Sequence, residues 1–363
     1  MTTPASSQSS GRYVTLDGLR GLAAIAVAIF HLDGRIMPGG YLAVYFFFAL
    51  SGFVLLRTYG PRWGRELDAR AFVRLRLVRL LPLHAIGILL GSIFVVQGIV
   101  RGSDFHLDPV TFALSLPLNL VMLPSPFDPN LFPVNLPAWS LFFELLANVL
   151  MALVLFRLGR GALAALILLA GAGLVLAVAG PAFLPRTLAV PPSLNAGVRW
   201  DMFHVGALRT LFAFAAGMAL ASLQAPAPRA QGHAAWLCGA VLLALLAWPF
   251  PGEARKMADL AIALVALPLL VAGGSRVEPP AFLRRPAIFI GDVSFALYAV
   301  HPPIAAASKF VVRKLSLPPA VNVALFLGMA LVVAWFCTRY LDQPLRERLG
   351  RWLPGRGRLA ARA

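Results

Sequence analysis

Charged residues are scarce in this chain, and their scarcity excludes an ordinary water-soluble protein. Asp, Glu, Lys and Arg make up only 13% of the 363 residues, whereas 59% are hydrophobic. Soluble domains carry about 25% charged residues and bury their apolar residues in one core. The apolar residues here fall instead into repeated stretches long enough to cross a bilayer, about 20 residues each. We therefore predict an all-α, polytopic membrane helix bundle without a soluble domain.

Cysteine is also rare, and its placement argues against a disulfide. Cys238 and Cys337 both lie inside apolar stretches, which is typical of small buried side chains. A net charge of +17 would favour nucleic acid as a partner in a soluble protein. Here the basic residues fall between apolar stretches, as in the cytoplasmic loops of membrane proteins. No nucleic-acid partner is expected, and no spacing of residues suggests a metal site.

About ten stretches are expected to span the membrane. They are Tyr13–Leu32, Gly40–Thr58, Leu80–Val100, Ala138–Leu158, Gly161–Gly180, Val205–Leu223, Ala234–Trp248, Met257–Gly273, Ala287–Ala307 and Ala320–Leu341. An eleventh stretch, Pro109–Leu123, is apolar but short and broken by proline, so we interpret it as re-entrant or interfacial. If it crossed the membrane, the orientation of every later segment would invert.

The distribution of arginine and lysine predicts the orientation. The connection Arg57–Arg79 carries seven arginines, and the segment Arg339–Arg362 carries another seven. Because basic residues favour the cytoplasmic side, both termini are expected in the cytoplasm. One connection is an exception to this distribution, because Lys309, Arg313 and Lys314 are expected on the outer side. We expect residues 1–11 to be disordered, 12–345 to form the membrane domain and 346–363 to form a basic cytoplasmic tail.

Two polar groups lie in the first span and directly before the third, with Arg20 expected near the cytoplasm and His31 deep or towards the outside. An ionised side chain at the bilayer centre costs at least about 2.5 kcal/mol, so such residues are functional candidates. Asp17 and Arg20 open the first span, and His31 lies eleven residues after Arg20, on the same helix face. Arg76 and Arg79 also share a face, and guanidinium groups bind phosphate well. The alternatives are that His31 only ends a span and that the arginines are ordinary positive-inside charge.

Two further groups lie in later spans. Ser140 and Glu144 are four residues apart on one helix face. Without a neighbouring cation, Glu144 would have a raised pKa and could act as an acid or base; alternatively it is a structural partner of an arginine or histidine on another helix. Ser294, Tyr298 and His301 also share one face, either as part of a site or as a polar cluster at a helix end.

Together these motifs resemble the acyltransferase family 3 of bacterial membrane proteins, over nearly the whole chain. The matching segments, in order, are Tyr13–Ala23, Arg20 with His31, Gly40–Phe53, Arg76 and Arg79 before Pro82, Trp139–Glu144 and Ser294–His301. Three features depart from the family pattern. Tyr45 stands where the family often has Asp, Asp342-Gln343-Pro344 replaces Glu-x-Pro, and no SGNH-type hydrolase domain follows the spans, so a relay through such a domain would need a separate protein.

The resemblance implies transfer of an acyl group, often acetyl, from cytoplasmic acyl-CoA to a hydroxyl of a carbohydrate or glycoconjugate. On this reading Arg20, Arg76 and Arg79 hold the donor phosphates. His31 deprotonates the acceptor or passes through a transient acyl state, and Glu144 is a second catalytic group. Asp17, Ser140, Ser294, Tyr298 and His301 have supporting roles. Acyl-CoA is then a substrate and not a bound cofactor, and lipid and the carbohydrate acceptor are the other partners.

Two other classes of protein compete with an enzyme. A transporter or flippase for a glycoconjugate would also carry intramembrane His, Glu and Arg and proline-interrupted segments. It should show related half-chain repeats, which the sequence lacks, and it would not release CoA. A membrane scaffold without catalysis poorly explains several polar groups inside apolar helices. The acceptor and the acyl chain length stay open at this point.

Overall fold

The protein is a bundle of helices. The computed structural model describes residues 11–102, 107–179, 194–224 and 229–351. The first half contains α1 Val14–Leu32, η1 Gly40–Leu42, α2 Ala43–Tyr59, η2 Gly60–Arg62, α3 Ala69–Arg101, α4 Pro109–Leu120, α5 Ala138–Leu153, η3 Leu155–Arg157 and α6 Arg160–Ala179. The second half contains η4 Trp200–Met202, α7 Phe203–Leu223, β1 Ala230–Gln231, α8 Ala234–Ala247, α9 Gly252–Ala261, η5 Ile262–Ala266, α10 Leu267–Gly274, β2 Val277–Glu278, α11 Ala281–Lys314, α12 Pro319–Phe336, η6 Cys337–Asp342 and α13 Gln343–Gly350.

The predicted fold class is confirmed, and each of the ten predicted spans coincides with helix. In the described chain, eight helices or continuous helical runs are long and apolar enough to cross a membrane. The other two predicted spans correspond to α5 and α8, which are apolar but shorter, with 16 and 14 residues. The doubtful eleventh stretch forms α4, whose 12 residues are capped by Asp108 and contain Pro117.

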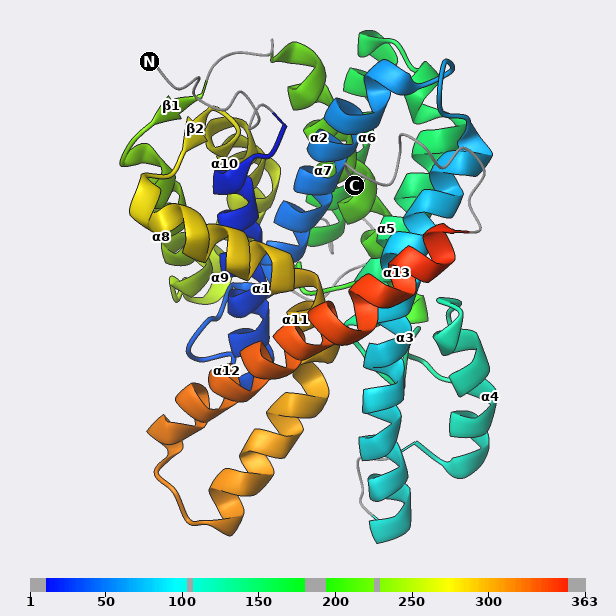
Figure 1. The fold of residues 1–363 in the computed structure, drawn as a ribbon, viewed down its shortest axis with the longest axis vertical. Helices are drawn as coiled ribbons and strands as arrows, with labels where there is room; N and C mark the ends of the chain where they lie inside the picture. Colours follow the sequence, from blue (N-terminus) through cyan, green and yellow to red (C-terminus); the bar gives the residue numbers. More distant parts are fainter. Residues whose placement is uncertain (1–10, 103–106, 180–193, 225–228, 352–363) are drawn as a thin grey trace, which may run out of the picture.

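Figure 1 shows how these helices are arranged. Strands β1 and β2 form a short parallel pair beside α10 at the upper end of the view. Two hairpins, α3–α4 and α11–α12, extend to the lower end. The chain then rises along α12 and ends its described part in α13, which packs against α3. The C-terminal part of the described chain is thereby joined to α3 in its first third.

Helices α1 and α11 form the seam that positions most of the polar residues. The two helices run parallel, because Arg20 contacts Gly291 and His31 contacts His301 further along both. Their backbones approach closely at glycines. A Cβ on Gly21 would lie 2.4 Å from Ile290 Cγ1, and one on Gly291 would lie 2.7 Å from Asp17 Cβ. Small residues allow this approach in membranes, where packing and not hydrophobic exclusion drives association.

Helices α2 and α7 form a second close pair. A Cβ on Gly217 of α7 would lie 1.9 Å from the carbonyl oxygen of Ala49, and one on Gly52 of α2 would lie 2.1 Å from that of Phe214. Each glycine therefore leaves room for the backbone of the opposite helix. A larger side chain at either position would overlap backbone atoms, and a change of side-chain rotamer could not remove that overlap.

Two domain boundaries can be compared with the structure in part. Residues 346–350, the first part of the expected basic tail, lie in helix α13, which runs from Gln343 to Gly350 and packs on α3, and the boundary at residue 346 stays a prediction. Residues 1–10 and 352–363, which hold most of the two expected terminal segments, lie outside the described chain. Both cysteines are free, with Cys337 buried and Cys238 half-buried.

We predict that Gly217→Ala destabilises the protein by about 1–3 kcal/mol, because its new methyl group would overlap backbone. Gly328→Ala in α12 is the matched control, since its Cβ meets nothing within 4 Å. Thermal unfolding of both variants in detergent checks this. Equal melting temperatures for the two variants would show that the α2–α7 contact is looser than described.

Candidate active site

Arg20 ties the beginning of α1 to α11. Its Nε donates to Ser294 Oγ at 3.0 Å, and its Nη2 donates to the Gly291 carbonyl at 2.8 Å. The same guanidinium forms an ion pair with Asp17 at 3.1 Å, and Asp17 also pairs with Arg12 at 2.5 Å. Three residues that the sequence singled out, Asp17, Arg20 and Ser294, therefore lie in one cluster.

Glu144 has a cation beside it. Its Oε1 accepts from Arg76 Nη2 at 3.2 Å and from Ser51 Oγ at 3.1 Å. The condition on which a raised pKa was argued, the absence of a neighbouring cation, is therefore not met. This contact matches the second reading of Glu144, as the partner of an arginine on another helix. Among the described residues, none links the Glu144 carboxylate directly to His31.

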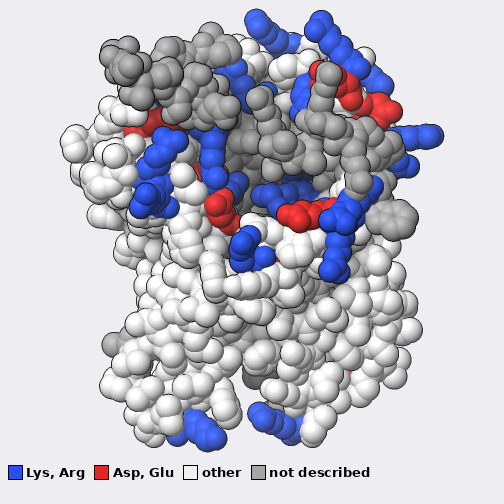
Figure 2. Space-filling model, in the orientation of Figure 1, with Lys and Arg blue, Asp and Glu red and all other residues white. Residues whose placement is uncertain are grey.

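Four arginines gather between α1, α3 and α13. Arg20, Arg76, Arg346 and Asp342 all lie within electrostatic range of Arg79. Asp342 itself is paired with Arg346. In the described chain, Arg79 forms no hydrogen bond or ion pair of its own. Figure 2 shows Lys and Arg gathered in the upper half of the molecule around a hollow, with few at the lower end.

Arg346 was missed by the sequence analysis, which assigned it to the tail. The available signal was its spacing from Asp342, since residues four apart on a helix face each other. The structure makes this pair part of the arginine cluster, because α13 packs against α3.

His31 and His301 meet at the other end of the α1–α11 seam. His301 Nε2 lies 3.2 Å from His31 Nδ1, and the His301 side chain is fully buried. His301 Nδ1 lies 2.8 Å from the Tyr298 carbonyl, and His31 Nδ1 lies 2.9 Å from the Val27 carbonyl. Since a carbonyl can only accept, both Nδ1 atoms carry the proton in the neutral rings.

This assignment of protons has a chemical consequence. His31 Nδ1–H donates to Val27 and to the lone pair on His301 Nε2, which leaves the lone pair of His31 on Nε2. His31 is exposed, and within the described chain no group bonds its Nε2. A neutral histidine with a free, accessible Nε2 lone pair is a suitable general base.

Ser140 and Tyr298 lie together next to this pair. Ser140 Oγ lies 2.7 Å from the Tyr298 hydroxyl, and both hydroxyls contact the Pro137 carbonyl, at 3.1 and 3.3 Å. Tyr298 also supplies the carbonyl that holds His301. Ser140 of α5 is therefore joined through Tyr298 to the pair formed by His31 and His301.

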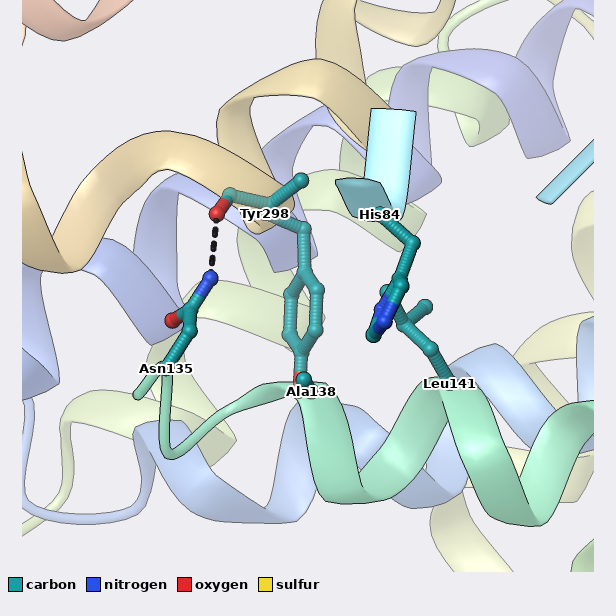
Figure 3. A pocket seen from close by; sticks show the side chains of 6 residues that line it. His84, Asn135, Ala138, Leu141 and Tyr298 are labelled. Atoms are coloured by element: carbon teal, nitrogen blue, oxygen red, sulfur yellow. Dashed lines mark hydrogen bonds between the residues drawn. The ribbon is translucent and has the colours of Figure 1, made fainter. Parts of the chain in front are cut away.

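A small polar pocket borders Tyr298 on its other side (Figure 3). The Tyr298 ring stands between Asn135, which donates to the Ala299 carbonyl, and His84. His84 is buried to 1% exposure, and its Nε2 lies 2.6 Å from the Asn119 carbonyl. Its Nδ1 has no partner in the described chain. The pocket therefore presents an unused acceptor atom close to the candidate site.

Arg209 lies within α7 and is only 1% exposed. Its guanidinium lies 4.5 Å from the Tyr45 ring and 5.0 Å from the Trp139 ring, and it donates to the Ala196 carbonyl. Trp139 directly precedes Ser140 in α5, so Arg209 stabilises this part of α5 through its contact with the Trp139 ring. A lone arginine inside an apolar run was the available signal.

Comparison with known proteins identifies the class of molecule to which this site belongs. The sequence model of the acyltransferase domain family, the family 3 named above, matches residues 13–339. The chain therefore belongs to this family and is a multi-pass membrane acyltransferase.

Three relatives illustrate the similarity. Protein 2 in picA locus of Rhizobium radiobacter is 38% identical over 156 residues, which cover 39% of this chain and 81% of that protein. The putative peptidoglycan O-acetyltransferase YrhL of Bacillus subtilis (strain 168) is 40% identical over 74 residues, 20% of this chain and 12% of YrhL. The O-acetyltransferase OatA of Staphylococcus aureus (strain NCTC 8325 / PS 47) is 38% identical over 76 residues, 20% and 13% of the two chains. The similarity thus spans a small part of both O-acetyltransferases. No solved structure matches this chain.

We predict that neutral His31 and His301 carry their proton on Nδ1, because each Nδ1 faces a carbonyl. Nitrogen NMR of the protein labelled with ¹⁵N-histidine distinguishes the two tautomers, and the signals are assigned by their loss in His31→Gln and His301→Gln. A neutral His31 protonated on Nε2 would contradict the arrangement.

Proposed function

We propose that this protein transfers an acyl group, an acetyl group in the simplest case, from cytoplasmic acyl-CoA to a hydroxyl of a cell-surface or lipid-linked carbohydrate. One observation carries the proposal: the α1–α11 seam has an arginine cluster at one end and a histidine with a free lone pair at the other. The similarity to segments of two proteins named as O-acetyltransferases supports acetyl as the acyl group.

The arginine cluster suits the phosphates of CoA. Arg79 lies among three other arginines with no acid of its own in the described chain, so an incoming anion would relieve a repulsion that the folded protein already bears. Arg76 is held in place by Glu144, and Arg20 is held by Asp17 and Ser294. Guanidinium groups fixed in this way bind phosphate through paired hydrogen bonds.

The distance between the two ends fits the donor. Arg20 and His31 are eleven residues apart on one helix, which corresponds to about 16 Å along the axis. The flexible pantetheine arm of CoA separates its phosphates from its thioester and can extend over such a distance. Phosphates bound at the arginines would therefore place the thioester carbonyl near His31.

His31 would act as the general base. Its Nε2 takes the proton of the acceptor hydroxyl while the hydroxyl oxygen attacks the thioester carbonyl. The new ester C–O bond forms, the C–S bond breaks, and the CoA thiolate leaves and takes up a proton. His301 and the Val27 carbonyl hold the Nδ1–H of His31, so that Nε2 keeps its direction and the charged ring is stabilised.

We assign Glu144 to positioning Arg76, because its carboxylate is shared between Arg76 and Ser51. Ser140 and Tyr298 hold the backbone that carries His301. The end with the arginines would face the cytoplasm of a bacterial inner membrane, because most basic side chains gather there.

We predict that His31→Ala lowers acyl transfer by roughly 10²–10⁴-fold, the range typical of a lost general base. His233→Ala, at the exposed N-terminal end of α8, is the matched control and should retain activity. The measurement is CoA release and surface-glycan acylation, with membrane insertion verified for both variants. Normal acylation by His31→Ala would exclude the proposed base.

We predict that Arg79→Gln weakens acyl-CoA binding by roughly tenfold or more, as expected for a lost charge-assisted contact to phosphate. Arg339→Gln is the control, because Arg339 is exposed and bonds only Gln343 on its own helical segment. Acyl-CoA dissociation constants and their salt dependence report the effect. Equal weakening in both variants would indicate general electrostatics and not a defined donor site.

A further inference from the structure

A cavity lies at the end of the bundle opposite the arginine cluster. Its volume is about 380 Å³, and it is lined by the end of α1 and by residues of α11 and α12. The lining begins at Leu32, the residue after His31, and includes Asp33, Arg35, Lys309 and Asn322. The cavity is therefore next to the proposed base and is distinct from the donor end.

The charges in this cavity do not balance. Asp33 is bound by Arg35 through Nε at 3.0 Å and Nη2 at 2.8 Å, and it also accepts from the Arg35 backbone N–H at 3.0 Å. These contacts hold the pKa of the Asp33 carboxyl at about 2, with a smaller contribution from Lys309. Asp33 is thus occupied by Arg35, and within the described chain Lys309 forms no ion pair. The cavity keeps one uncompensated positive charge.

The cavity also offers a polar atom that lacks a partner. Asn322 Oδ1 is buried and accepts no hydrogen bond in the described chain. A buried acceptor left unpaired costs free energy until a donor reaches it. A hydroxyl of a bound ligand would supply that donor, while Lys309 would hold an anionic group.

The position of Lys309 relative to the base is compatible with one extended ligand. Lys309 follows His301 by eight residues of α11, about 12 Å along a helix. A group held at Lys309 would therefore lie a short distance from a hydroxyl at His31, as on the same sugar chain or its carrier.

The charge distribution along the chain supports a functional reason for Lys309. The connection containing Lys309, Arg313 and Lys314 lies on the side where basic residues are disfavoured, given the orientation proposed above. All three side chains are exposed near the end of α11, but of the three Lys309 alone lines the cavity. A positive charge against the general trend is expected where it binds a ligand.

We propose that this cavity is an acceptor subsite that recognises an acidic group, a carboxylate or a phosphate, carried by the carbohydrate acceptor. Lys309 binds the anion, Asn322 accepts a hydrogen bond from a hydroxyl, and Asp33 limits the affinity by occupying Arg35. This inference rests on the proposed function, because it names the class of acceptor for that reaction.

Binding is tested with the full-length protein in detergent, using glucuronate and glycerol 1-phosphate as anionic probes and glucose as the neutral probe. Saturable thermal stabilisation gives the dissociation constants. We expect Lys309→Gln to weaken binding of the favoured anion about fivefold, Asp33→Asn to strengthen it, and Lys314→Gln, the matched control, to leave it unchanged. Stabilisation by glucuronate alone indicates an acidic sugar, and stabilisation by glycerol 1-phosphate alone indicates a phosphate. No stabilisation by either anion, equal stabilisation by glucose, or no difference between Lys309→Gln and Lys314→Gln would overturn the proposal.

Acylation is tested in membrane vesicles with acetyl-CoA and the de-O-acylated surface glycan of cells lacking the protein. The glycan is offered intact, and after its carboxylates are reduced and its phosphates removed. We expect the neutralised glycan and the Lys309→Gln variant each to raise KM about fivefold with little change in kcat. Equal KM values for the intact and neutralised glycans would overturn the inference. If the wild-type protein acylates neither glycan, the proposed function fails instead, and the binding measurement still decides whether an anion subsite exists.

Discussion

The close, parallel packing of α1 against α11 is the constraint on which the rest of the site depends. Two helices whose backbones meet at Gly21 and Gly291 cannot slide past one another without steric overlap. Their fixed register places Arg20 opposite Ser294 and, further along, His31 opposite His301. In lipid, where hydrophobic exclusion does not hold helices together, such backbone contact and the polar contacts between helices supply the attraction. One seam thus both stabilises the bundle and orders the candidate site residues along a line.

Charge inside the bundle is handled differently at its two ends. At the arginine end, acids are distributed so that Asp17, Glu144 and Asp342 each hold an arginine, and Arg79 remains without an acid. At the opposite end, Asp33 forms an ion pair with Arg35, whereas Lys309 forms no ion pair among the described residues. In both places paired residues fix the geometry, while Arg79 at one end and Lys309 at the other have no ion pair among the described residues. The proposed reaction between an anionic donor and an acidic acceptor would use one such charge at each end, with the proposed base between them.

Arg209 shows how the bundle tolerates a cation without a carboxylate at bonding distance. Its guanidinium is enclosed by the rings of Tyr45 and Trp139 and by backbone carbonyls. Tyr45 occupies the position where the sequence resemblance led us to expect Asp in related proteins. An aromatic face can partly replace a carboxylate in stabilising a buried guanidinium, and Tyr45 supplies such a face to Arg209.

The sequence by itself determined the fold class, the positions of ten helical segments and a set of candidate residues for the chemistry. It could do so because hydropathy and helix periodicity are local properties, and because a polar side chain in an apolar run is conspicuous. It did not determine partners. That Glu144 pairs with Arg76, that α13 brings Arg346 to Arg79, and that His84 and Arg209 are buried depend on which helices are neighbours. Neighbouring helices are chosen by shape complementarity between distant segments, and only the tertiary structure contains that information.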